Sequence, residues 1–147
     1  GEEFWPHVIE PTWGVDRSVL VVLLDAYREE GEGDKKRVFL KLPPKLAPYQ
    51  VAVFPLLANK PQLMEKVQDV FSRLLHAPCS MLHVAWDARG NIGKRYYAQD
   101  EIGTPWCVTV DFQTLEDDTV TVRDRDTAQQ ERVAVPELEG YFSARLQ

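Results

Sequence analysis

The chain has 147 residues, 44% of them hydrophobic and 27% charged, which is enough for a domain with a real core and typical of an ordinary globular protein. Its net charge of −6 excludes a nucleic-acid binder that relies on a broad basic surface, and its longest apolar run, residues 19–24, is too short to cross a membrane. The two cysteines, Cys79 and Cys107, lack the spacing of a disulfide framework or a zinc site, which fits a protein of the reducing cytoplasm.

The first thirty residues predict a strand, a turn and a helix. Residues 7–10 are apolar enough for a short strand, residues 11–14 form a turn, and Asp16 is a candidate cap for a helix over residues 17–27. That helix is apolar on almost every side, so we expect it to lie inside a core larger than this chain supplies. Because the chain opens on strand-like sequence without a methionine, we expect a piece of a longer protein whose N-terminal side is absent.

A connecting region follows this helix. Residues 28–36 are charged and contain two glycines, which predicts an exposed, mobile linker. Residues 37–42 alternate as a strand does, and the prolines within residues 43–48 predict a stiff crossover between two domains.

From Tyr49 onward the pattern predicts the element order βαβαβββα. Pro61 suits the first turn of a helix, Asn91 caps the next helix, Gly103 stops it, and Pro136 opens the last one. Strands interleaved with helices favour an α/β fold with a mixed sheet covered by helices. Strands are expected at residues 51–57, 81–86, 106–112, 119–125 and 129–135, and helices at residues 61–75, 91–102 and 136–146.

Four long blocks of this sequence, in the right order, resemble the glycyl-tRNA synthetase family of class II aminoacyl-tRNA synthetases. Residues 7–17, H-V-I-E-P-T-W-G-V-D-R, resemble motif 3 of the catalytic domain, a strand–turn–helix with the pattern E-P-S-x-G-x-x-R. Residues 41–48 resemble the connection to the next domain. Residues 90–105, followed by 108–112 and 119–126, resemble the family's anticodon-binding domain.

The resemblance implies a division of the chain into three parts. Residues 1–30 are expected to be the C-terminal end of a catalytic domain, residues 31–48 a linker and crossover, and residues 49–147 a class IIa anticodon-binding domain with a mixed five-stranded sheet flanked by helices. The intact enzyme is expected to be a cytoplasmic homodimer without membrane contact that activates glycine with ATP and Mg²⁺ and transfers it to tRNA(Gly). This chain alone is expected to be inactive, because the other two class II signature motifs are absent from it.

Arg17 is the candidate catalytic residue. An arginine at the start of a buried helix is always charged and can meet phosphate oxygens with two hydrogen bonds, and the resemblance assigns Arg17 to the γ-phosphate end of ATP. The alternative is an ordinary arginine paired with Asp16 or Glu10. Gly14 leaves room for the adenine ring close to the backbone. The ATP-binding residues implied by the resemblance are Gly14, Val15, Asp16 and Arg17.

Glu10 and Thr12 are the candidate glycine-binding residues. The resemblance assigns Glu10 to the ammonium group of glycine, for which a carboxylate is the suitable partner. The alternative for Glu10 is a turn or helix-cap carboxylate. Thr12 stands where the family has serine, and its extra methyl group either tightens the glycine pocket or turns away from it.

A local basic cluster is the candidate anticodon contact. Arg89, Lys94 and Arg95 flank Tyr96 and Tyr97, and unstacked RNA bases bind to aromatic rings and guanidinium planes. The alternatives are that a tyrosine fills the core, that the cations form a solvated helix face, and that residues 123–126 form an ion-paired hairpin end. The G-N-I-G sequence at residues 90–93 lacks the spacing of a nucleotide-binding loop, and none of the three histidines has the spacing of a metal site.

Two other functions remain open at this point. A synthetase-like chain could serve as a non-catalytic accessory subunit of a DNA polymerase, but Glu10, Gly14 and Arg17 are all intact, which a protein without activation chemistry does not need. A free-standing anticodon-binding-like module is the second alternative, and the apolar helix at residues 17–27 argues against it.

Overall fold

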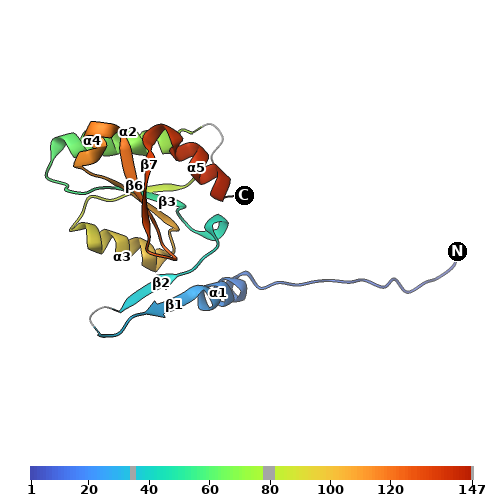
Figure 1. The fold of residues 1–147 in the computed structure, drawn as a ribbon. Coiled ribbons are helices and arrows are strands. Elements are labelled where there is room, and N and C mark those ends of the chain that lie inside the picture. The colour runs from blue at the N-terminus through green and yellow to red at the C-terminus, as the bar shows by residue number, and fades with distance from the viewer. Residues whose placement is uncertain (34–35, 78–81, 147) are drawn as a thin grey trace.

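A computed structural model of the protein describes residues 1–33, 36–77 and 82–146. The first fourteen residues form no regular element and run away from the rest of the molecule with exposed side chains (Figure 1). The strand predicted at residues 7–10 is therefore absent, since a strand needs a neighbour for its backbone hydrogen bonds and none lies beside this segment.

Helix α1 (Val15–Ala26) follows this segment. It begins earlier than predicted, with Gly14 and not Asp16 at the N-cap position, and no side chain caps it. Asp16 lies in the first turn instead, where its negative charge interacts favourably with the positive end of the helix dipole. Almost all the large apolar side chains of α1 are exposed, as expected of a helix whose core lies elsewhere.

An antiparallel hairpin comes directly after α1. Strand β1 (Tyr27–Glu30) pairs with β2 (Arg37–Leu40), with Tyr27 opposite Leu40 and Glu30 opposite Arg37. The prediction of a linker is thus wrong for residues 28–30. These charged residues show no alternation because both faces of β1 are exposed, so the sequence pattern gives no sign of a strand. A short 3-10 turn, η2 (Pro44–Leu46), then leads into the main domain.

The main domain is built on a five-stranded mixed sheet with the strand order β4-β3-β5-β6-β7. Its strand β3 is parallel to β4 and β5, and β6 is antiparallel to its two neighbours, β5 and β7. Pro55 ends β3, as expected of a residue that cannot donate to the ladder. The strands are β3 (Val51–Pro55), β4 (Val84–Trp86), β5 (Trp106–Val110), β6 (Thr119–Asp124) and β7 (Gln130–Ala134).

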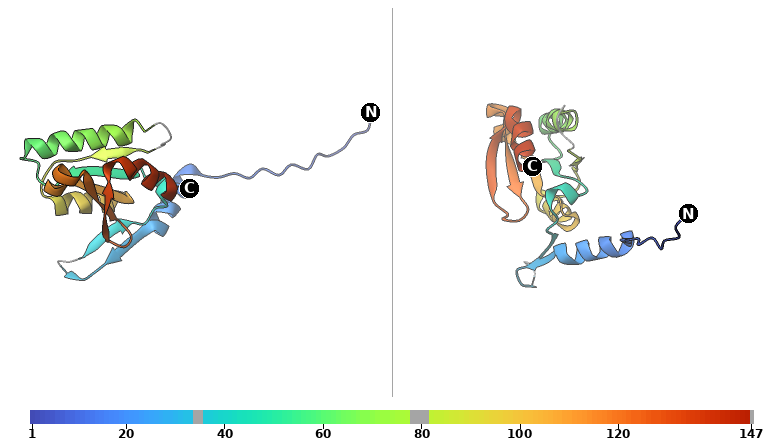
Figure 2. Two further views of the ribbon diagram at one scale, coloured as in Figure 1. Left: turned by 45° about the horizontal axis from the view of Figure 1, so that its top comes forward. Right: turned by 90° about the vertical axis from the view of Figure 1, so that its right-hand side faces the viewer.

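Helices cover both faces of this sheet (Figures 1 and 2). One face packs against α2 (Pro61–Leu75) and α5 (Leu138–Arg145) and forms the main core, in which Leu63, Val108 and Phe142 are fully buried. The other face packs against α3 (Ile92–Ile102). The predicted α/β fold, with a mixed five-stranded sheet flanked by helices, is confirmed.

Several predicted ends of helices and strands are confirmed, and others differ from the prediction by a few residues. Asn91 caps α3 by accepting a hydrogen bond from the Lys94 backbone N–H at 2.9 Å, and Gly103 ends this helix in the left-handed conformation. A short helix, α4 (Phe112–Asp117), interrupts the expected run of strands. Asp111 and Thr114 form a capping box there, so the alternation predicted to continue through Phe112 stops at Val110.

The C-terminal and central boundaries also shift by a few residues. A 3-10 turn, η3 (Val135–Glu137), precedes α5, so the last helix begins after Pro136. The fourth strand was predicted from Met81, which lies outside the described residues, as does Cys79. Burial raises the pKa of the Cys107 thiol, which is free and packs below α3. Within the described part of the chain, no helix has the length and apolar character that a membrane crossing requires.

Candidate nucleic-acid interface

A crevice of about 370 Å³ lies outside the carboxyl ends of β3 and β4. Its walls are the loop that leads from β3 toward α2 and the loop that leads from β4 into α3, including Gly90 and the cap residue Asn91. Ligands of open α/β sheets bind in crevices at the carboxyl ends of the strands. Of the four predicted RNA-contact residues, Arg95 lines this crevice; Arg89 belongs to the second loop, and Lys94 and Tyr96 belong to α3.

Arg95 lines the crevice and connects its two walls. It is 2% exposed, and its guanidinium donates from Nη1 to the carbonyl of Pro55 and from Nη2 to the carbonyl of Gly90 at 3.2 Å. Its Nε is buried without a partner. The expectation of an exposed arginine stacked on RNA bases therefore does not fit this structure, and Arg95 instead fixes the shape of the crevice.

Tyr96 also faces inward. Its hydroxyl lies 2.6 Å from Oγ1 of Thr109, and its ring meets Phe54 edge-on with centroids 5.8 Å apart. The guanidinium of Arg123 lies over the ring, 4.9 Å from its centroid. For this tyrosine the core alternative describes the structure better than a contact with RNA, and burial raises the pKa of its hydroxyl.

The exposed cations of the interface are Arg89, Lys94 and Lys60. Arg89 projects from the surface with 91% of its side chain exposed, yet it binds Asp87 through Nε to Oδ1 at 2.9 Å and Nη2 to Oδ2 at 3.1 Å. This pairing lowers the pKa of Asp87. No ion pair engages Lys60 or Lys94 among the residues that the structure describes.

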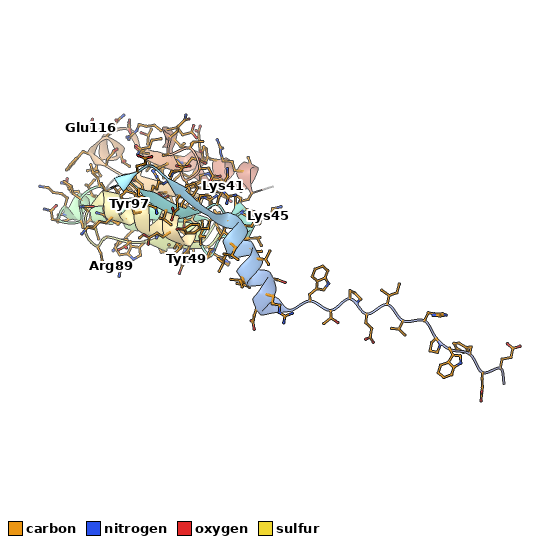
Figure 3. The ribbon with its side chains drawn as sticks, turned by 90° about the horizontal axis from the view of Figure 1, so that it is seen from below. Lys41, Lys45, Tyr49, Arg89, Tyr97 and Glu116 are labelled. Atoms are coloured by element: carbon orange, nitrogen blue, oxygen red, sulfur yellow. The ribbon has the colours of Figure 1, made fainter. Side chains whose placement is uncertain are left out.

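Two exposed aromatic residues lie close by in the chain: Trp86, which the sequence did not single out as a contact, and Tyr97, which it placed beside the basic cluster. Trp86, at the carboxyl end of β4, is 42% exposed. Tyr97 is 49% exposed and faces outward from α3, on the face that also displays Arg89 (Figure 3). Tyr97 lies three residues after the exposed Lys94, a spacing that puts these two side chains on one side of α3.

The predicted active-site residues lie apart from this interface. Glu10, Thr12 and Gly14 belong to the extended N-terminal segment, and Val15, Asp16 and Arg17 form the first turn of α1 (Figure 3). All six are exposed. None of the six lines the crevice, and no ion pair joins Arg17 to Asp16 or Glu10 within the described residues.

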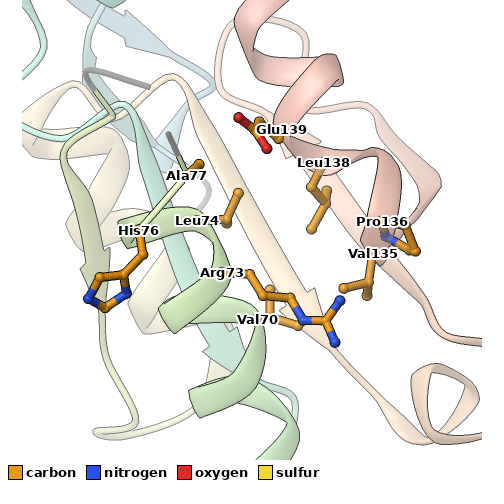
Figure 4. Close-up of a pocket in the computed structure, with 9 residues that line it drawn as sticks. All are labelled: Val70, Arg73, Leu74, His76, Ala77, Val135, Pro136, Leu138 and Glu139. Carbon is orange, nitrogen blue, oxygen red and sulfur yellow. The ribbon is translucent and has the colours of Figure 1, made fainter. Parts of the chain in front are cut away.

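A second cavity, of about 320 Å³, lies between the end of α2 and the start of α5 (Figure 4). Arg73 and Glu139 stand at its rim, and Arg73 binds Asp69 through Nε at 3.1 Å. None of the predicted site residues lines this cavity. In the parts of the chain that the structure describes, no three histidine, cysteine or acidic side chains come together in a way that would hold a metal ion.

Comparison with known proteins gives the family. Residues 50–145 match the anticodon binding domain family. The chain is 48% identical to the glycine–tRNA ligases of Borreliella afzelii, over 147 residues, and of Clostridium acetobutylicum, over 146 residues. These alignments cover 99% of this chain but only 32% and 30% of the relatives, so the chain spans about a third of the length of the curated relatives it matches.

Solved structures agree with this assignment. A prolyl-tRNA synthetase from Cryptosporidium parvum, complexed with L-proline and AMP, matches with a TM-score of 0.65 and 27% identity over 73% of this chain and 22% of that one. The same enzyme complexed with halofuginone and AMPPNP matches with a TM-score of 0.66. The sequence match over residues 50–145 and the fold described above therefore agree, and this chain belongs to the anticodon-binding domain family.

Proposed function

We propose that this chain is the part of a glycine–tRNA ligase that recognises the anticodon of tRNA(Gly) and supplies one segment of the active site. The observation that carries this proposal is the 48% identity to glycine–tRNA ligases over 99% of the chain, because the alignment includes the segment that precedes the anticodon-binding domain. The intact enzyme would activate glycine with ATP and Mg²⁺ and then charge tRNA(Gly). We propose a cytoplasmic homodimer, as the family resemblance implies.

The RNA contact is proposed at the crevice beyond β3 and β4. Residues 56–60 and 87–95 carry four cations and one anion, in a chain whose net charge is −6. An RNA phosphate can bind Lys94 directly, and it can compete with Asp87 for the guanidinium of Arg89. Trp86 and Tyr97 offer exposed rings on which unstacked anticodon bases can stack. Arg95 contributes by holding the crevice in shape and not by touching RNA.

The active-site segment is proposed at residues 10–17. Glu10 and Thr12 would bind glycine, and residues from Gly14 to Arg17 would bind ATP. Since the apolar side chains of α1 are exposed in this chain, we propose that they pack against the remainder of the catalytic domain in the intact enzyme. That packing would bring the carboxylate of Glu10 and the guanidinium of Arg17 into one pocket with the groups that bind the α-phosphate.

The test of anticodon recognition uses the full-length enzyme with Lys94→Gln. Lys41→Gln is the matched control, because Lys41 is also exposed but lies beyond β2, which packs against the other end of α3. Losing one exposed phosphate contact costs about 1 kcal/mol, so we expect kcat/KM for tRNA to fall roughly fivefold with Lys94→Gln. Lys41→Gln should leave it unchanged, and glycine-dependent ATP–pyrophosphate exchange should be normal in both variants.

The same assay with altered tRNAs completes the test. Substituting anticodon bases should reduce the rate of tRNA charging more than substituting the same number of acceptor-stem bases. Equal losses from the two lysine variants, or equal losses from the two kinds of tRNA change, would contradict an anticodon contact at this crevice.

A further inference from the structure

Asp100 is the most deeply buried charge in the described part of the chain. It lies near the C-terminal end of α3 with no exposed surface and accepts hydrogen bonds from two arginines of other elements. Arg123 of β6 donates to both of its oxygens, from Nη1 to Oδ1 at 2.9 Å and from Nη2 to Oδ2 at 3.1 Å. Arg37 of β2 donates from Nε to Oδ2 at 2.8 Å. One carboxylate thus ties the hairpin to the helix and the sheet.

The remaining donors of Arg37 are engaged as well. Its Nη2 donates to the backbone carbonyl of Arg125, and its Nη1 lies 3.4 Å from the carboxylate of Glu30 on the partner strand of the hairpin. The guanidinium also stacks over the ring of Phe39, 4.3 Å from its centroid. A surface arginine that served only solubility would not have every nitrogen occupied by a different element.

A second connection between the hairpin and the main domain lies directly beside the Arg37–Asp100 ion pair. The buried guanidinium of Arg125 donates from Nη1 to the Gly103 carbonyl at 2.6 Å and from Nη2 to the Leu42 carbonyl at 2.9 Å. Gly103 itself has no space for a side chain, since a Cβ atom there would lie 2.8 Å from Cδ1 of Leu42 and 3.0 Å from the Leu40 carbonyl. The end of β2 is therefore pressed against the end of α3.

These two connections link the crevice to the proposed active-site segment at residues 10–17. The N-terminal end of α3 borders the crevice through Asn91 and Ile92, and its other end, about 16 Å away for eleven residues, holds the hairpin (Figure 2). The hairpin continues without a break into α1, and the Lys41 N–H donates to the Ala26 carbonyl at 2.7 Å. Strands β1 and β2 are thus attached to the anticodon-binding domain and do not form a loose linker.

We infer that Arg37 and Asp100 are positioning residues that couple the RNA interface to the active-site segment. Their ion pair makes the hairpin and α3 one rigid unit, so that tRNA bound at the crevice has a fixed orientation relative to α1 and Arg17. This inference rests on the proposed function. It assigns the pair no contact with substrate: its effect is on how productively a bound tRNA presents its acceptor end for glycine transfer.

Arg37→Gln in the full-length enzyme tests the coupling, because it removes the hairpin's ion pair with α3 while Asp100 keeps both hydrogen bonds from Arg123. We expect normal glycine-dependent ATP–pyrophosphate exchange and a normal KM for tRNA. We expect kcat for charging to fall roughly tenfold, since misplacing a reacting group by about 1 Å is costly. The kcat penalty for a wrong anticodon should also shrink. Arg37→Lys should recover part of kcat, because lysine keeps the ion pair but loses the fork geometry.

Arg73→Gln is the matched control, an exposed arginine on α2 whose ion pair with Asp69 touches neither region. It should leave every parameter unchanged. Parallel losses of exchange and charging in Arg37→Gln would reveal a merely structural role and overturn the inference, and so would a higher KM for tRNA with unchanged kcat.

Hydrogen exchange on the 147-residue chain tests the rigid unit independently of catalysis. In the unmodified chain the amides of β2 should be protected to an extent similar to those of α3. Arg37→Gln should speed exchange in the hairpin and leave β5 and β6 unchanged. A hairpin that exchanges freely before any substitution would overturn the rigid connection, whereas absence of glycine activation by the unmodified full-length enzyme would instead refute the proposed function.

Discussion

Arg17 occupies the first turn of α1 with its side chain exposed and with no ion pair among the described residues. In the full-length enzyme we expect Arg17→Ala to reduce glycine-dependent ATP–pyrophosphate exchange roughly 100-fold, the usual effect of removing one charge-assisted contact from a dry active site. Arg17→Lys should recover only part of this loss, because a point charge cannot reproduce two parallel hydrogen bonds.

The control for Arg17 is Arg28→Ala, an exposed arginine of β1 whose guanidinium donates to the nearby carbonyls of Asp25 and Tyr27. Both variants should melt at the temperature of the unmodified enzyme. An Arg17→Ala enzyme that melts early but exchanges normally per folded molecule would show a packing role and would contradict the assignment to ATP.

Residue types alone did not reveal which charges are internal. Arg95 was predicted as an RNA contact because it follows Lys94 in a basic cluster, yet its partner, the Pro55 carbonyl, is forty residues away in the sequence. Asp100 and Arg123 likewise give no local sign of their pairing. Local signals such as the Asn91 cap were predictable, since both partners lie within one helical turn.

At the scale of secondary structure, the alternating and helical patterns predicted the sheet and its covering helices correctly. The patterns failed to predict two elements whose sequences have no helical or alternating periodicity, β1 and α4. Strand β1 is exposed on both faces, so its charged sequence looked like a linker, and α4 is shorter than two turns, too short to show a helical stripe. Both elements are specified by contacts that they make with partners: β1 by its pairing with β2, and α4 by its capping box.

The packing of β2 against the end of α3 predicts an unusual sensitivity at Gly103. Gly103→Ala should destabilise the 147-residue chain, because alanine pays about 1–2 kcal/mol for the left-handed backbone at φ 85° and its Cβ would clash with Leu42. We expect the melting temperature to fall by roughly 2–8 °C in a thermal unfolding experiment.

Gly140→Ala is the matched control for this substitution. Gly140 lies inside α5, and apart from its chain neighbours and the nearby helix backbone no atom of the described residues lies within 4 Å of the position that a Cβ atom would occupy there. Alanine at this position should therefore stabilise the helix by about 0.5–1 kcal/mol. Opposite signs for the two substitutions are the expected result. A neutral Gly103→Ala would mean that the hairpin does not press on α3 in solution.

At the scale of the whole molecule, charge is separated between the crevice and the rest of the surface. The net charge is −6, while the two loops that form the crevice carry an excess of cations. An acidic body repels nucleic acid from most directions and leaves the crevice as the favourable approach. We therefore expect affinity for tRNA to depend on a small number of phosphate contacts, and nonspecific binding to duplex DNA to be weak.

This charge distribution sets the expected salt dependence of tRNA binding. Two or three exposed cations, Lys60, Lys94 and Arg89, should give a slope of log K against log salt concentration of about −2, since each neutralised phosphate contributes about −0.7 to −0.9. Fluorescence anisotropy with the 147-residue chain between low and moderate potassium chloride measures this slope. Lys94→Gln should make it shallower by one such increment, and Lys41→Gln should leave it unchanged. A slope several times steeper, or one that both lysine variants reduce equally, would mean that RNA binds a broad surface and not the crevice.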